Sequence, residues 1–72
     1  MYFNVDIDTP MTPSEYTDFQ DWFDKTIGTE YHSENWISPE GDRLYAVTVF
    51  EVTYTELDKI REYESMYIEP KN

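Results

Sequence analysis

The stretch RLYAVTVFEV, residues 43–52, decides what kind of fold this chain can form. It predicts a strand, and apolar side chains occupy most positions on both of its faces. One predicted face comprises Leu44, Ala46, Thr48, Phe50 and Val52, and the other comprises Tyr45, Val47 and Val49. A strand with two apolar faces is either central in its sheet or turns its second face to a partner.

Two further strands are predicted on the N-terminal side of this one. Residues 29–38 form a strand whose imperfect alternation allows a bulge or an irregular start. The turn composition of Pro39-Glu40-Gly41-Asp42 predicts that this strand and residues 43–52 form a hairpin. Residues 2–8 alternate apolar and polar side chains as a half-buried strand does, and Thr9-Pro10 ends it because proline has no N–H for the ladder.

The clearest helix signal covers residues 13–27. Thr12 and Glu15 form a T-x-x-E capping box, and Pro13 occupies the first helical position. Gly28 is the expected C-terminal stop. The apolar stripe of this helix comprises Tyr16, Phe19, Phe23 and Ile27.

A second helix is predicted over residues 55–66. Thr55 and Asp58 resemble a capping box with Asp in place of Glu. Its apolar side comprises Leu57, Ile60, Tyr63 and Tyr67, with Glu64 among them. The tail, residues 67–72, either docks on the domain or frays.

The predicted order, β-α-β-β-α, indicates a single two-layer α+β domain over residues 1–72. We expect a small antiparallel or mixed sheet with the two helices on one face. The order contains most of a ferredoxin-like half-pattern. The chain has no cysteine, so a core of this size depends on good packing or self-association.

Charge is the most pronounced property of the composition. Sixteen Asp and Glu residues against five Lys and Arg residues give a formal net charge of −11. The chain would repel nucleic-acid phosphates and anionic membranes, so we expect neither as a direct partner. A basic protein surface is the expected partner. The start of the chain lacks the basic and apolar regions of a signal peptide, and we expect a cytoplasmic protein.

Four acids recur at every third position of the first predicted helix: Glu15, Asp18, Asp21 and Asp24. With Glu15 set at 0°, the later three lie at roughly 300°, 240° and 180°, opposite an apolar stripe at roughly 40–120°. Successive acids are about 4.5 Å apart along the axis, so their carboxylates can match the spacing of nucleic-acid phosphates. Trp22 falls at roughly 340°, between the acids and the stripe, where an aromatic ring can anchor a binding surface.

A solvated helix face explains any single acid of this row. It explains four acids less well, because Asp has low helix propensity and like charges repel. Acids also continue outside the helix. We therefore predict a partner-binding surface that comprises Glu15, Asp18, Asp21, Trp22 and Asp24, together with Glu30, Glu34, Glu40, Asp42, Asp6 and Asp8.

In size, charge, lack of cysteine and interleaving of acids with aromatic residues, the chain resembles the small acidic proteins of bacteriophages. Many members of that class are DNA mimics that inhibit host DNA-binding proteins, among them HU-type nucleoid proteins, restriction enzymes, CRISPR effectors, RNA polymerase and uracil-DNA glycosylase. The resemblance implies an inhibitor that occupies the basic DNA-binding surface of a host protein in the bacterial cytoplasm. The alternative is a small adaptor or regulatory subunit that binds a folded partner without imitating DNA.

Neither catalysis nor a metal or other cofactor is expected. Asp6-Ile7-Asp8 begins like a calcium loop, but Thr9-Pro10 breaks that pattern. His32 is the only histidine and has no cysteine companion. The chain has no nucleophile elbow or phosphate loop, and a domain of 72 residues has little room for a substrate pocket.

The aromatic segment near the C-terminus allows two interpretations. It either packs into the core or forms the interface of a homodimer, which would double the acidic face. On balance we expect the dimer. The residues concerned are Tyr63, Met66, Tyr67 and Ile68.

Overall fold

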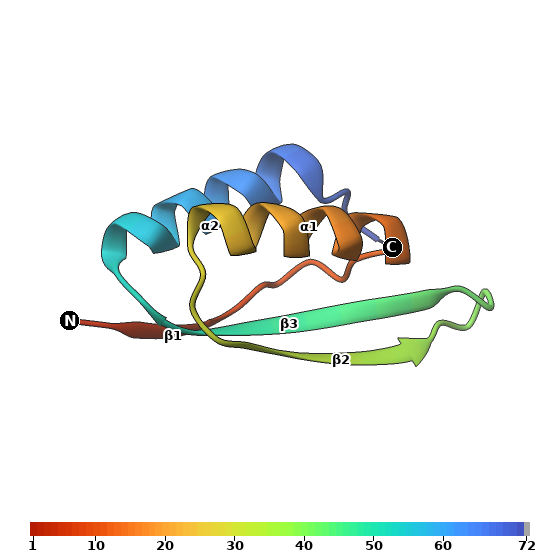
Figure 1. The fold of residues 1–72 in the computed structure, drawn as a ribbon. Coiled ribbons are helices and arrows are strands. Elements are labelled where there is room, and N and C mark those ends of the chain that lie inside the picture. The colour runs from red at the N-terminus through yellow and green to blue at the C-terminus, as the bar shows by residue number, and fades with distance from the viewer. Residues whose placement is uncertain (72) are drawn as a thin grey trace.

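A computed structural model describes residues 1–71 of the chain. Its elements are β1 (Phe3–Asp6), α1 (Pro13–Thr26), β2 (Tyr31–Ile37), β3 (Arg43–Val52) and α2 (Tyr54–Tyr67). The three strands form one antiparallel sheet in the order β1-β3-β2. Both helices lie on the same side of this sheet (Figure 1), which confirms the predicted two-layer α+β fold.

The strand β3 is central, as its two apolar faces predict. The sequence allowed a bulge in β2, but the pairing of β2 with β3 is regular over all of β2. The irregularity lies between β1 and β3, where the register changes from Phe3↔Val52 to Val5↔Val49. There Glu51 has a positive φ of 56°. This bulge turns Val52 into the core, so the face predicted for Val52 was wrong.

The helix α1 begins at Pro13 as predicted and ends at Thr26, one residue before the predicted end. The Thr12 side chain accepts from the N–H of Glu15, and the Glu15 carboxylate accepts from the N–H of Thr12, so the capping box is complete. Gly28 follows the helix with a φ of 81°, and its N–H donates to the carbonyl of Phe23 at 2.8 Å. A glycine adopts this left-handed conformation without the penalty that a Cβ brings.

The helix α2 begins earlier than predicted, at Tyr54. Its capping box is formed by Thr53 and Glu56, so the assignment of this role to Thr55 and Asp58 was wrong. Because Thr53 directly follows the last residue of β3, a single residue connects the strand to the helix. Tyr67, predicted on the apolar side, is 60% exposed.

The core lies between the helices and the sheet. It comprises Ile7, Met11, Phe19, Phe23, Val47, Val49, Val52, Ile60, Tyr63 and Ile68. Aromatic pairs connect the two layers, for example Tyr16 of α1 stacked on Tyr45 of β3 with ring centroids 4.3 Å apart. Such a pair adds about 0.5–1.5 kcal/mol to the stabilisation that burial alone provides.

The C-terminal tail docks as far as Lys71. Ile68 is buried in the core, and the ammonium group of Lys71 lies 2.6 Å from the Glu15 carboxylate at the start of α1. The tail prediction also covered Asn72, which lies outside the described residues. Within residues 1–71 no helix combines the length and apolar character that crossing a membrane requires.

Candidate functional site

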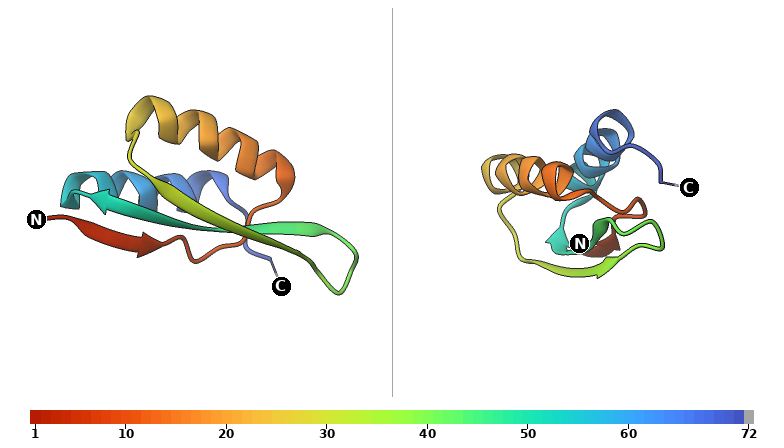
Figure 2. Two further views of the ribbon diagram at one scale, coloured as in Figure 1. Left: turned by 60° about the horizontal axis from the view of Figure 1, so that its bottom comes forward. Right: turned by 90° about the vertical axis from the view of Figure 1, so that its right-hand side faces the viewer.

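The two helices lie side by side and run in opposite directions (Figure 2). The solvent side of α1 carries Asp18, Asp21 and Asp24, all exposed. The solvent side of α2 carries Asp58 and Glu62, also exposed, which lie about 160–200° around the helix from the buried Ile60. We call these five residues the acidic helix face. It brings acids of two neighbouring helices onto one side of the molecule.

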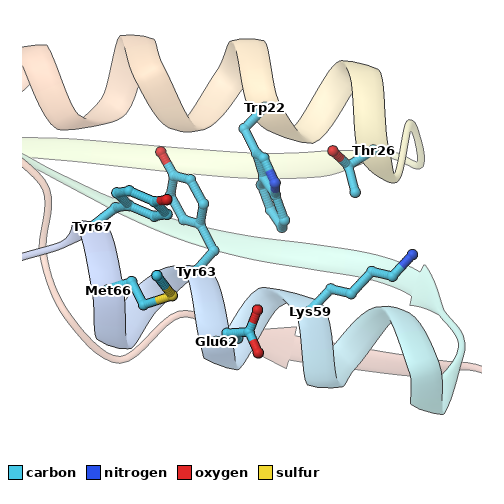
Figure 3. A pocket seen from close by; sticks show the side chains of 7 residues that line it. All are labelled: Trp22, Thr26, Lys59, Glu62, Tyr63, Met66 and Tyr67. Atoms are coloured by element: carbon cyan, nitrogen blue, oxygen red, sulfur yellow. The ribbon is translucent and has the colours of Figure 1, made fainter.

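A groove of about 440 Å³ separates the helices within this face. Its lining comprises Trp22, Thr26, Lys59, Glu62, Tyr63, Met66 and Tyr67 (Figure 3). The Trp22 ring reaches from α1 towards α2 and stacks on Tyr63, with ring centroids 4.3 Å apart. Met66 and Tyr67 lie at one end of the groove and are 63% and 60% exposed. The groove between the helices therefore combines aromatic and apolar side chains with the ammonium group of Lys59 and the carboxylate of Glu62.

Tyr63 connects this groove to the charge around it. Burial raises the pKa of the Tyr63 hydroxyl above its ordinary value, and the negative charge of Asp18 raises it further. Tyr63 therefore stays neutral at physiological pH, as its place in the core requires.

Glu15 does not belong to the acidic helix face, although its spacing predicted that it would. Its carboxylate is 17% exposed and accepts from the ammonium group of Lys71 and the N–H groups of Thr12 and Glu69. Burial raises the pKa of Glu15, but these hydrogen bonds outweigh burial and hold it below its ordinary value. Glu15 therefore stabilises the fold, and the acid row of α1 reduces to three residues.

The predicted acids of the strands and loops lie away from the acidic helix face. Asp6 accepts a hydrogen bond of 2.6 Å from Thr48 across β1 and β3, and Asp8 lies 3.7 Å from Arg61. Glu30 directly precedes β2 and Glu34 lies within it, and Glu40 and Asp42 lie in the hairpin turn. The structure therefore divides the predicted surface between the helix layer and the sheet.

The basic side chains leave most of the acidic helix face uncompensated. Lys25 pairs with Asp21 at 3.2 Å and Lys59 lines the groove together with Glu62, whereas the ion pairs of Lys71 and Arg61 lie elsewhere. In the part of the chain that the structure describes, no basic group lies within 4.0 Å of the carboxylates of Asp18, Asp24, Asp58 and Glu62.

Sequence reasoning missed Asp58 and Glu62. The signal was present, because the two acids are one helical turn apart and lie opposite Ile60. What the sequence could not provide was the antiparallel pairing of the helices, which brings these acids beside those of α1.

The aromatic segment near the C-terminus divides between core and surface. Tyr63 and Ile68 are buried, so of the four residues predicted for a dimer interface only Met66 and Tyr67 are exposed. A search of residues 1–71 for three or more His, Asp or Glu side chains that could hold a metal ion found none. The chain matches no protein-family model, no curated protein and no solved structure.

Proposed function

We propose that this protein inhibits a nucleic-acid-binding protein of its host by occupying the basic surface of that protein, as a DNA mimic. One observation carries the proposal: two antiparallel neighbouring helices with a groove between them both carry exposed acids, Asp18, Asp21 and Asp24 on α1 and Asp58 and Glu62 on α2. Two lines of negative charge across a groove are the feature that phosphate-binding Lys and Arg side chains recognise in a duplex.

The contacts would be charge-assisted hydrogen bonds from Lys and Arg of the target to these carboxylates. Such bonds are shorter and stronger than neutral ones, and opposite charge also accelerates the encounter. The acids are already exposed, so the helix layer would need little rearrangement to bind. Inhibition would be competitive, because the same basic groups cannot hold phosphates and carboxylates together.

The groove would supply the apolar contact that charge alone does not. Trp22 is fixed against Tyr63, whereas Met66 and Tyr67 are exposed beside it. Large, partly exposed aromatic side chains near the centre of an interface often dominate its binding energy. An arginine of the target could stack on one of these rings and pair with Asp18 or Glu62.

The test is capture of partners from nuclease-treated bacterial lysate, with duplex DNA as competitor. The wild-type protein should retain a basic DNA-binding protein that DNA releases. The triple variant D18K/D21K/D24K should lose at least about tenfold in affinity, because three carboxylates become repulsive. The control variant E30K/E40K/D42K has the same change in net charge, located directly before β2 and in the hairpin turn, and should bind as the wild type does. Equal loss in both variants would contradict a site on the helix layer.

A second candidate function is favoured by the exposure of Met66 and Tyr67. An adaptor would use these side chains as its main contact, and its complex would be insensitive to DNA and only weakly sensitive to salt. The variant M66A/Y67A would then abolish binding, whereas D18K/D21K/D24K would not. The opposite result favours the DNA mimic.

A further inference from the structure

The strand β2 has an open hydrogen-bonding edge. The N–H of Phe50 donates to the carbonyl of Glu30, and the N–H of Ser38 donates to the carbonyl of Asp42. In this register the backbone N–H and C=O groups of the even-numbered residues of β2 point towards β3. The backbone groups of the alternate residues therefore point away from the sheet. These residues are Tyr31, Ser33, Asn35 and Ile37, and nowhere in residues 1–71 does another element pair with them.

This edge lacks the features by which proteins usually prevent strand addition. The strand β2 is seven residues long, pairs without a bulge and contains neither proline nor lysine. The other edge of the sheet differs. There β1 has four residues, and Arg61 donates to the carbonyl of Asp6 at 3.2 Å. The open edge is therefore a specific property of β2.

We propose that the edge of β2 pairs with β2 of a second copy of this chain, antiparallel and with Ser33 opposite Ser33. This two-fold register joins the outward N–H and C=O groups of the two strands. It also places Glu34 of each copy directly opposite His32 of the other, in a pair that is not hydrogen-bonded through the backbone. Side chains approach most closely in such pairs.

Charge selects this register over its nearest alternative. A shift to Glu34 opposite Glu34 would use all seven residues of β2, but it would set two carboxylates against each other, which is destabilising. With Ser33 at the axis, a His32 N–H can donate to the opposite carboxylate whether or not the ring is charged. Within one copy His32 Nε2 lies 3.7 Å from Glu34 Oε1, and the two side chains are 64% and 77% exposed, so the contact across the axis would replace this loose pair.

The helix layer is compatible with this pairing. Two side chains of α1 lie over β2. The Tyr16 hydroxyl donates to the Ser33 hydroxyl at 2.8 Å, and the Gln20 amide donates to the Tyr31 hydroxyl at 2.9 Å. These side chains are uncharged, so the two copies of α1 would not oppose carboxylates directly above the axis. A two-fold axis perpendicular to the sheet leaves both helix layers on the same side of a six-stranded sheet. The inference does not depend on the proposed inhibition.

Disulfide formation tests the register, because the natural chain has no cysteine. The variants H32C and E34C, mixed and oxidised, should form a mixed disulfide, since paired Cα atoms about 4.5 Å apart are within bonding range. Each variant alone should cross-link several-fold more slowly. A mixed disulfide that forms no faster than the two self-cross-links would overturn the register.

Sedimentation equilibrium tests the dimer itself. The wild type should dimerise, and E34K should raise the dimer dissociation constant about tenfold, because the altered pair occurs twice. Adding H32E to E34K should restore dimerisation by reversing the charges of the pair. N35P removes an outward N–H and should give a folded monomer, checked by circular dichroism. A wild type that remains monomeric, or an E34K that dimerises as well as the wild type, would overturn the proposal.

Discussion

At the scale of single residues, Glu15 contributes most visibly to the fold. Its carboxylate joins the start of α1 to the C-terminal tail through Thr12, Glu69 and Lys71. Burial raises its pKa and the hydrogen bonds lower it by more, so the folded state releases the proton more readily than the unfolded state does. The stabilisation by Glu15 is therefore complete above the ordinary pKa of 4.5 and is lost as the pH falls through the folded value.

We predict that E15Q lowers the free energy of unfolding by about 1–2 kcal/mol at neutral pH, because the ion pair with Lys71 is lost and the N–H groups of Thr12 and Glu69 no longer donate to a charged acceptor. The difference from wild type should shrink as the pH falls below 4.5. Urea unfolding at several pH values measures it. The control D21N removes an exposed acid of the same helix and should change the stability by no more than about 0.5 kcal/mol. A pH-independent E15Q effect would contradict the role of the charge.

At the scale of elements, the start of α2 distinguishes two similar sequence signals. Thr53 caps the helix together with Glu56, whereas Thr55 lies inside the helix. We predict that T53A costs about 1 kcal/mol of stability, whereas T55A leaves the stability unchanged or raises it by a few tenths, because Ala has a higher helix propensity than Thr. Thermal or urea unfolding of the two variants measures the difference. If T55A were the more destabilising variant, the helix would begin two residues later.

The elements also show how far the sequence predicts this protein. Several features were predicted from local signals. The capping box and Gly28 predict α1, the turn composition of residues 39–42 predicts the hairpin, and the two apolar faces of residues 43–52 predict the central position of β3. The bulge at Glu51 has no such signal, since glycine would usually mark a positive φ. That one residue reverses the face of Val52. The acids of α1 were predicted from helical spacing, whereas the neighbouring acids of α2 and the structural role of Glu15 depend on tertiary contacts.

At the scale of the whole molecule, a net charge of −11 opposes folding and favours a basic partner. Salt should therefore raise the stability of the fold and weaken the binding of such a partner. Screening weakens repulsion among exposed carboxylates, and we predict that salt in the range of about 0.02–0.3 M raises the free energy of unfolding. The same salt should weaken the complex with the captured partner, because attraction is screened as well.

The two charge-reversal triple variants separate these effects. Both D18K/D21K/D24K and E30K/E40K/D42K reduce the net charge equally, so both should show a shallower dependence of stability on salt. Only the first should lose the partner. Urea unfolding and binding titrations on the same samples give both quantities. If the two variants lost binding in parallel with net charge, attraction would depend on total charge, and the arrangement of carboxylates along α1 and α2 would not matter.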